Sequence, residues 1–385
     1  MWTEVDVLIV GGGPTGLFLA ALLRQQGVSC IVLEKQIEPS THSRSIGIHP
    51  PSLELLGDIG IVEALIQKGV KVCAGRAYYD GVEQGSFSFS SCPPPFDFVL
   101  TIPQFVTESI LTEALAALDP NCLLMGLNVL EVVDQGEYVH VLAEGSGNKH
   151  TFRARIVVGC DGKNSVVRAA SGIKFEGKDY GDVYTMGDFE DDSPLGNDAG
   201  IFLGRLGLVE SFPVPNQIRR WVVRMPTFVE SPTPKQLASE VASRTGFQIP
   251  IETCSMISSF KVSKYTAPSF HSNRVVLAGD AAHIVSPIGG QGMNLGWLDA
   301  HVLSKALSRA FSDPDPNSQQ ISKHLQAYSR SRKRATRKAQ KRSELNMWFG
   351  RPHRMSWIRR LAIYSILSRS IQPLFARLFT MRGLE

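Results

Sequence analysis

The chain has 385 residues, 43% hydrophobic and 20% charged, a composition that excludes a low-complexity or disordered protein, and its length predicts two domains or one domain with a large insertion. Its six cysteines form no CxxC pair or closely spaced framework, which argues against a zinc site or disulfide scaffold and favours a reducing, cytoplasmic compartment. The net charge is only +4, but residues 330–385 hold 15 lysines and arginines against two acids, a balance of +13 that leaves −9 elsewhere.

The first predicted strand leads into a glycine-rich turn. Residues 5–10 are a short apolar run, residues 11–16 read GGGPTG, and an apolar helical segment follows. In such a unit Gly11 permits a tight turn, Gly13 lets the backbone approach a pyrophosphate, and Gly16 allows the helix to pack closely on the strand. This order of strand, turn and helix is typical of a dinucleotide-binding cradle.

The helix after the turn starts at Pro14 and Thr15, and its N-terminus offers free N–H groups to phosphates. A second apolar strand, residues 30–33, ends at Glu34 and Lys35, where an acid accepts hydrogen bonds from an adenosine ribose and repels a 2′-phosphate. A glycine turn alone is weak evidence, but the complete β-α-β context favours a cradle. The cradle accepts either FAD or NAD.

Two middle segments depart from this pattern. Residues 72–101 and 175–270 are β-rich, and residues 104–118 between them form an amphipathic helix. The sequence predicts an antiparallel sheet over the cofactor, with mostly apolar residues around an aromatic or otherwise hydrophobic substrate. Core packing is the commoner use of each aromatic residue there: Tyr78, Tyr79, Phe87, Phe89, Phe202, Phe212 and Trp221. Spacing identifies no catalytic base.

Two later strands run into further turns. Residues 155–159 lead into Cys160-Asp161-Gly162, and residues 274–278 lead into Gly279-Asp280. Taken singly, either acid is explained by capping of the next helix. No second ligand stands at metal-binding spacing from His283, so we predict no metal site. The second turn continues into a loop that starts a helix: Pro287, Gly289, Gly290, Gln291, Gly292, Met293 and Asn294.

Together these motifs resemble the single-component FAD-dependent aromatic hydroxylases of the para-hydroxybenzoate hydroxylase fold, the group A flavoprotein monooxygenases. The resemblance rests on GGGPTG, RSIGI (44–48), PQ (103–104), CDG (160–162) and the GDAAH to GGQGMN segment, and covers about the first 310 residues. It implies non-covalent FAD, with Asp280 on the ribityl chain and residues 289–294 around the isoalloxazine. Arg44 and Gln104 would hold the pyrophosphate and ribityl region, and Asp161 would close the pyrophosphate region and assist the nicotinamide donor.

The resemblance also implies a reaction. NADPH or NADH would reduce FAD, O2 would add at C4a, and the C4a-hydroperoxyflavin would hydroxylate an aromatic or hydrophobic small molecule. Alternatives on the same fold are a flavin-dependent halogenase and a prenyl-lipid reductase, and a non-catalytic flavin-binding protein that docks on membranes is a third. The tryptophan-rich signature of halogenases is not apparent.

Two positions limit the transfer of family contacts. His49-Pro50-Pro51 stands where many relatives carry an arginine-containing segment, so contacts from that loop cannot be carried over. Arg44 has an alternative use as a solvated surface arginine.

The tail is predicted to be helical and basic. A Pro-rich loop at residues 312–317 precedes a long basic helix over residues 319–348. Near the end an apolar stripe predicts an amphipathic helix that packs on its own domain, binds a membrane interface or dimerises: Ile371, Leu374, Phe375, Leu378 and Phe379. The anionic partner of the tail is a membrane surface, nucleic acid or the protein's own acidic body, and nucleic acid is the least supported because interleaved aromatic residues are lacking.

The sequence therefore predicts an α/β protein in which a Rossmann-type FAD-binding domain carries an inserted antiparallel sheet. The FAD-binding domain would comprise residues 1–71, 102–174 and 271–311, and the substrate-binding sheet residues 72–101 and 175–270. Residues 312–385 would form a basic helical segment. The predicted location is cytoplasmic, with peripheral membrane contact as an alternative.

Overall fold

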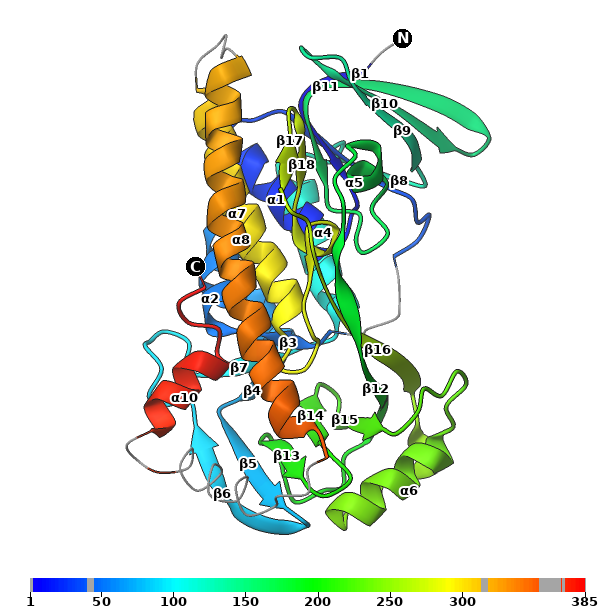
Figure 1. Cartoon of the computed structure of the whole chain (residues 1–385), viewed down its shortest axis with the longest axis vertical. Coiled ribbons are helices and arrows are strands. Elements are labelled where there is room, and N and C mark those ends of the chain that lie inside the picture. The colour runs from blue at the N-terminus through cyan, green and yellow to red at the C-terminus, as the bar shows by residue number, and fades with distance from the viewer. Residues whose placement is uncertain (1–2, 40–44, 313–317, 353–367, 369–370, 385) are drawn as a thin grey trace.

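The computed structural model describes residues 3–39, 45–312, 318–352, 368 and 371–384 (Figure 1). Arg44 and nearly all of the predicted Pro-rich loop lie outside the described residues. The described chain forms two large sheets, one at each end of the view, and a long helix runs between them.

The sheet at the upper end of Figure 1 is parallel at its centre. β1 pairs in parallel with β11 and β2, and residues 7–10 of β1 are buried, as expected for a parallel strand covered on both faces. In pairing order the strands are β17 (His271–Ser272), β18 (Val275–Leu277), β11 (Asn148–Gly159), β1 (Thr3–Val10), β2 (Cys30–Glu34) and β8 (Leu123–Met125), with β10 (Val139–Gly145) and β9 (Asn128–Asp134) extending from β11.

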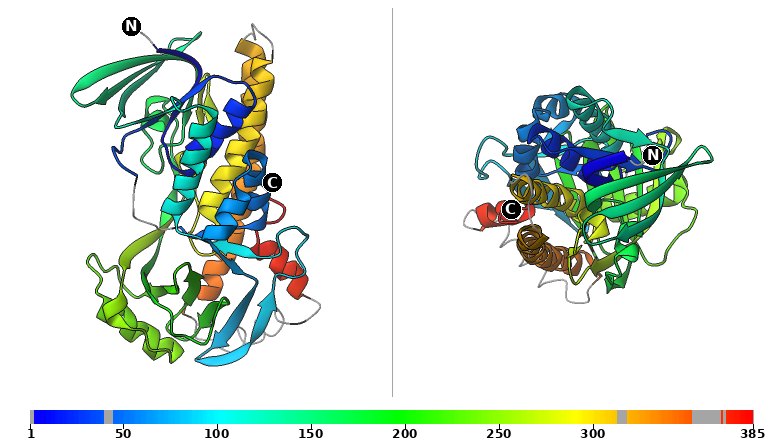
Figure 2. Two further views of the ribbon diagram at one scale, coloured as in Figure 1. Left: turned by 180° about the vertical axis from the view of Figure 1, so that it is seen from behind. Right: turned by 90° about the horizontal axis from the view of Figure 1, so that it is seen from above.

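Helices cover this sheet and connect it to the rest of the molecule. α1 packs against α4 and α7, and α8 packs along α7 (Figure 2). The helices are α1 (Pro14–Gln25), α2 (Pro50–Leu56), α3 (Val62–Lys68), α4 (Gln104–Leu118), α5 (Val166–Ala170), α6 (Pro234–Thr245), α7 (Gln291–Phe311), α8 (Ser318–Gly350) and α10 (Gln372–Phe379), with short 3-10 turns η1 (Gly57–Ile59), η2 (Ile251–Thr253) and η3 (Gly279–Ala281).

The second large sheet, called the roof sheet below, lies at the lower end of Figure 1. In pairing order it contains β19 (His283–Ile284), β16 (Met256–Thr266), β12 (Glu176–Glu190), β15 (Ile218–Met225), β14 (Val209–Val214), β13 (Ala199–Leu203), β5 (Ala74–Tyr79) and β6 (Val82–Ser88). The antiparallel prediction is wrong for one pair, because β5 arrives from a separate chain segment and joins β13 in parallel. A small third sheet contains β3 (Gly47–Ile48), β7 (Val99–Thr101) and β4 (Val70–Val72).

The two faces of the roof sheet have different neighbours, because successive strand residues point to opposite sides. Trp221 and Phe202 face α6 and share a buried cluster with Leu237 of that helix. Tyr184 and Val222 face the other way, in a cluster that includes residues of the 287–294 loop and of α8. This second face is the one turned toward the predicted cofactor domain.

The tail folds back onto the body. Arginines of the tail pair with acids elsewhere in the chain: Arg332 with Asp299, Arg351 with Asp182 and Arg382 with Glu54. Of the three predicted anionic partners, the protein's own acidic body therefore accounts for part of the tail's charge. Among the described helices, none combines the length and hydropathy that crossing a bilayer requires.

One residue of the predicted apolar stripe packs on the body of the protein, and three others are exposed. On α10, the Phe379 ring stacks on Phe89 with a centroid separation of 5.8 Å, while exposed fractions are 42% for Ile371, 61% for Leu374 and 39% for Leu378. Among the described apolar side chains of the helix, Ala376 and Phe379 pack on β6 and its neighbourhood. The predicted domain boundaries stay a prediction.

Replacement of Phe379 by alanine should lower the free energy of unfolding by about 2 kcal/mol, because a partly buried ring leaves a cavity beside Phe87 and Phe89. Leu374→Ser is the matched control and should leave stability nearly unchanged, since that side chain is already exposed. Urea unfolding followed by circular dichroism measures both. Equal stability losses would mean that α10 is anchored through its exposed face.

Candidate functional site

The glycine turn has the geometry that a dinucleotide cradle needs. Gly11 adopts φ +107°, and a Cβ there would lie 2.5 Å from the Cys160 carbonyl oxygen. A Cβ on Gly16 would clash with the Gly11 carbonyl, so only glycine permits this approach of helix to turn. Gly13 differs, because a Cβ there would meet nothing within 4 Å. Protein packing explains Gly11 and Gly16, whereas open space in front of α1 surrounds Gly13.

The residues that flank this turn are also placed beside it. Glu34 accepts hydrogen bonds from the Gly12 N–H at 2.7 Å and from the Gln36 N–H at 2.9 Å, so its carboxylate is fixed at the end of β2. Each carboxylate oxygen keeps a further lone pair for a ribose hydroxyl. Lys35 is exposed next to it.

Asp161 follows β11 and caps a helix. Its Oδ2 accepts hydrogen bonds from the N–H groups of Val166 at 2.7 Å and Val167 at 3.2 Å, in the first turn of α5. The capping alternative is therefore realised for one carboxylate oxygen. Its Oδ1 is buried and has no hydrogen-bond partner within the described ranges. A cofactor role for Asp161 would have to use that oxygen and stays a prediction.

Asp280, unlike Asp161, caps no described helix through its carboxylate. It is exposed, and its carboxylate makes no hydrogen bond or ion pair with the part of the chain that the structure describes. The preceding Gly279 has φ +62°, and a Cβ there would come within 2.9 Å of Thr15 Oγ1. This close approach brings the Asp280 turn against the N-terminus of α1, where Pro14 occupies the first turn. The fold therefore joins the two motifs, which are about 265 residues apart.

The 287–294 loop turns sharply into α7. Gly289 and Gly290 adopt φ +87° and +65°, and Gly290 is the N-cap of the helix. Asn294 fixes the loop, because its Nδ2 donates to the carbonyls of Gly290 at 2.8 Å and Gly47 at 2.9 Å. The positive end of the helix dipole and its free N–H groups lie here. Gln291 and Met293 begin the helix, and the Oε1 of Gln291 is buried without a partner among the described residues.

His49 is a site residue that sequence reasoning set aside. Its N–H donates to Asn294 Oδ1 at 2.8 Å, and its ring Nε2 lies 3.0 Å from the Gly289 carbonyl. Burial lowers the pKa of His49 to about 4, so the ring is neutral. Because a carbonyl only accepts, Nε2 carries the hydrogen and Nδ1 is a bare acceptor, buried without a partner in the described chain. The sequence offered no signal for a partner some 240 residues away.

The remaining predicted positions are less informative. Gln104 begins α4 and donates from Nε2 to Glu108 Oε1 at 2.9 Å. Pro287 is exposed and Gly292 is half-buried. Among the described residues, no cluster of three or more histidine, cysteine or acidic side chains that could hold a metal ion occurs.

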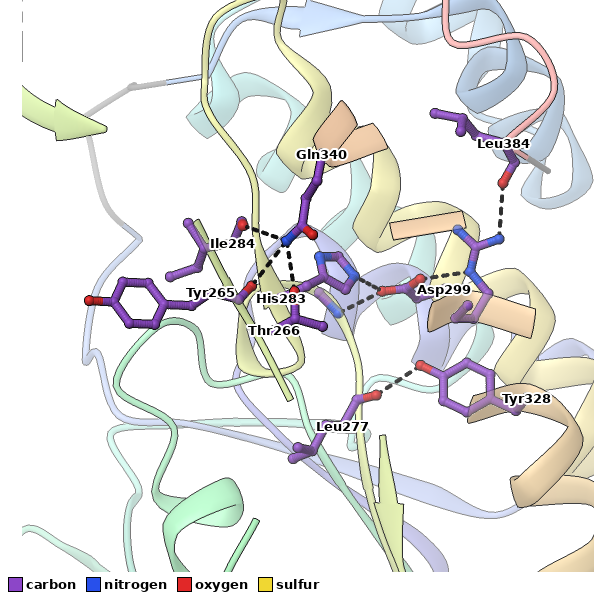
Figure 3. Close-up of polar contacts among 11 residues, drawn as sticks. Tyr265, Thr266, Leu277, His283, Ile284, Asp299, Tyr328, Gln340 and Leu384 are labelled. Carbon is purple, nitrogen blue, oxygen red and sulfur yellow. Dashed lines mark hydrogen bonds and ion pairs between the residues drawn. The ribbon is translucent and has the colours of Figure 1, made fainter. Parts of the chain in front are cut away.

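A buried charge cluster supports the Asp280 turn (Figure 3). Asp299 of α7 accepts hydrogen bonds from the Gly279 N–H at 3.1 Å and from Arg332 Nε at 2.7 Å, and it lies 2.5 Å from His283 Nε2. Arg332 also donates to the Leu384 carbonyl at 3.1 Å. Burial alone would raise the pKa of Asp299, but His283 and Arg332 outweigh it and hold that pKa below its usual value.

Replacement of Asp299 by asparagine should destabilise the protein by about 3–5 kcal/mol, because Arg332 is then buried without its counter-charge. The double variant Asp299→Asn with Arg332→Met should recover part of that loss, since no unpaired charge remains. Thermal unfolding of the single and double variants measures the coupling. Additive losses would mean that the pair contributes no electrostatic stability.

The chain is similar to known FAD-binding proteins. A family model described as an FAD binding domain matches residues 4–343. The chain is 33% identical over 318 residues to rifampicin monooxygenase of Streptomyces venezuelae, covering 79% of this chain and 64% of that protein. It is 30% identical over 308 residues to pentachlorophenol 4-monooxygenase of Sphingobium chlorophenolicum, covering 77% and 57%. The chain thus spans less than two thirds of the length of these relatives.

Solved structures share the fold. The crystal structure of p-nitrophenol 4-monooxygenase from Pseudomonas putida superposes with a TM-score of 0.90 at 23% identity, covering 100% of this chain and 99% of that one. The anhydrotetracycline hydroxylase of Streptomyces rimosus gives a TM-score of 0.81 at 28% identity, covering 98% and 76%. Both the α/β fold class and the resemblance to FAD-dependent aromatic hydroxylases are confirmed. Since the family model matches well over half of its residues, the chain belongs to the FAD binding domain family.

Proposed function

We propose that the chain is an FAD-dependent monooxygenase that uses NAD(P)H and O2 to hydroxylate an aromatic or otherwise hydrophobic small molecule. The observation that carries the proposal is the contact between the 287–294 loop and the roof sheet. Ile288 of that loop shares a buried cluster with Tyr184 and Val222 of the sheet and Met347 of α8. A mostly apolar sheet face over the loop would exclude water from the reacting ring.

The described residues fit FAD. Gly13 and the N-terminus of α1 would take the pyrophosphate, and Glu34 the adenosine ribose. The free carboxylate of Asp280 would accept hydrogen bonds from the ribityl hydroxyls. Backbone N–H groups of the loop at the start of α7 would stabilise the negative charge of the reduced ring. Bound FAD supplies the redox chemistry, and the protein supplies position, water exclusion and charge stabilisation.

The electron donor and the substrate class are finer parts of the proposal. The sequence holds no second glycine cradle, which supports a nicotinamide donor that docks briefly at the surface, and NADPH is favoured by family likeness alone. Relatives named for rifampicin, pentachlorophenol and tetracyclines support an aromatic substrate. Peripheral membrane contact stays a prediction, and the exposed Ile371, Leu374 and Leu378 are what support it.

Replacement of Gly13 by aspartate should abolish FAD retention without destabilising the ligand-free protein. Gly13 has φ −77° and open space around it, and aspartate is a favourable N-cap, so only the pyrophosphate would meet the new charge. Flavin absorbance after gel filtration and the melting temperature of the apoprotein measure the two effects. Gly57→Asp, at an exposed glycine with ordinary φ, is the control and should retain FAD. Yellow, FAD-loaded Gly13→Asp protein would refute the cradle assignment.

Turnover with isotopically labelled dioxygen should place one labelled oxygen atom in the product and the other in water. Probe substrates are 4-nitrophenol, pentachlorophenol, rifampicin and anhydrotetracycline, which are chosen from the names of the relatives. Consumption of NADPH should be faster with a hydroxylated probe than without one, as expected where substrate binding gates flavin reduction. Product oxygen that derives from water, or hydrogen peroxide as the sole oxygen product with every probe, would contradict a monooxygenase.

A further inference from the structure

We propose that the carboxylate of Glu210, on the face of the roof sheet turned toward the 287–294 loop, binds the hydroxyl group of a phenol-type substrate and takes up its proton. The inference rests on the proposed monooxygenase function and deepens it, because it names the substrate class and a residue that would recognise it.

The pairing register places Glu210 on this face. Met186, Val222, Glu210 and Ile201 are successive Cα partners across β12, β15, β14 and β13, so they form one row on one side of the sheet. The other three members of the row are apolar. Their side is the one opposite to α6, whose cluster contains the alternate residues of the same strands.

The same face meets the predicted flavin site. Met186 and Val222 from the row of Glu210 belong to the buried cluster that contains Ile288 of the 287–294 loop and Met347 of α8. The N–H of Leu208, just before β14, donates to the Gly350 carbonyl at 2.9 Å, which fixes this end of β14 to the end of α8. Figure 1 shows β14 and β15 beneath the lower end of α8. Glu210 is thus held at the junction of roof sheet, loop and helix.

Two polar groups at this place have no partner. Glu210 is 6% exposed, and its side chain makes no hydrogen bond or ion pair with the described chain. The hydroxyl of Tyr184 on the same face is buried and lacks a hydrogen-bond partner among the described residues. Leaving a buried carboxylate and a buried hydroxyl unpaired is costly, so the presence of both on one face of the sheet points to a ligand that completes them.

The charged groups on this face do not neutralise Glu210. Arg220 binds Asp188 through two hydrogen bonds of 2.6 and 2.7 Å. Arg224 and Arg351 both pair with Asp182, at 3.2 and 2.6 Å. Arg220 thus has a carboxylate of its own, and Arg224 and Arg351 share that of Asp182, so each of the three arginines is paired with an acid other than Glu210.

Burial accordingly raises the pKa of Glu210 to about 7, and burial together with the nearby Glu210 raises the pKa of Tyr184. A carboxyl group with a pKa near neutrality is suited to exchange a proton with a phenol. The neutral Tyr184 hydroxyl can donate to the same ligand.

These groups complement a phenol. Its O–H would donate to the Glu210 carboxylate, and transfer would break that O–H bond, leave the electron pair on the phenolate oxygen and make Glu210 neutral. The Tyr184 hydroxyl would then donate to the phenolate oxygen. A phenolate ring is richer in electrons at its ortho and para carbons than a phenol ring, which favours attack on an electrophilic oxygen.

The test compares binding of 4-nitrophenol and its methyl ether, 4-nitroanisole, to the FAD-loaded protein, followed by flavin absorbance without reductant. The wild-type protein should prefer the phenol by about tenfold or more, the size of one charge-assisted hydrogen bond. Glu210→Gln should reduce that preference to about twofold. The absorbance of bound 4-nitrophenol should also show its ionised form at lower pH in the wild type than in Glu210→Gln, a readout that a purely structural role would not change.

Glu252→Gln, at an exposed glutamate, is the control and should keep the wild-type preference. Should Glu210→Gln lose FAD, Tyr184→Phe removes one oxygen atom only and should lower the preference by about threefold. Equal binding of phenol and ether by the wild type, no binding of either, or an unchanged preference in folded Glu210→Gln would overturn the proposal. Failure of the monooxygenase function would look different, because phenol preference would persist while no labelled oxygen entered any product.

Discussion

The buried carboxylate of Asp299 is the contact on which the rest of the site depends. It lies inside the protein, where one isolated charge would be prohibitively costly, and it is stabilised by the ion pair with Arg332 and by the contact with His283. These three side chains come from α7, α8 and β19, and Asp299 also accepts from the Gly279 N–H, so the position of the Asp280 turn and the packing of the two helices are determined together. The Leu384 carbonyl extends the same arrangement to the end of the described chain.

The geometry of the GGGPTG turn could be predicted from local sequence alone. Gly11 and Gly16 are required by backbone geometry that follows from the GGGPTG turn itself, and Glu34 ends the very next strand, so the structure could be anticipated within one β-α-β unit. The bounds of α4, predicted as residues 104–118, agree with the structure for the same reason, because amphipathic periodicity is a local signal. The cofactor-binding roles of these residues stay predictions.

The rest depended on contacts between distant segments. Asp161 proved to cap α5, which a single sequence could not distinguish from a cofactor contact, since both uses follow a strand with an acid. The positions of His49 and Glu210 could not be predicted from the sequence. The partner of His49 lies on another loop, and Glu210 is isolated from other charges only once four strands have aligned. The parallel pairing of β5 with β13 was missed because no hairpin connects them.

The long helix α8 contacts both large sheets along its length. At one end Tyr328 donates to the Leu277 carbonyl of the parallel sheet, farther along Gln340 donates to Thr266 at 2.7 Å, and at the far end the Gly350 carbonyl holds the roof sheet. This one helix is thereby hydrogen-bonded to both the parallel sheet and the roof sheet. Bending of the roof sheet away from the parallel sheet would strain α8, so the helix holds the two sheets at a fixed separation.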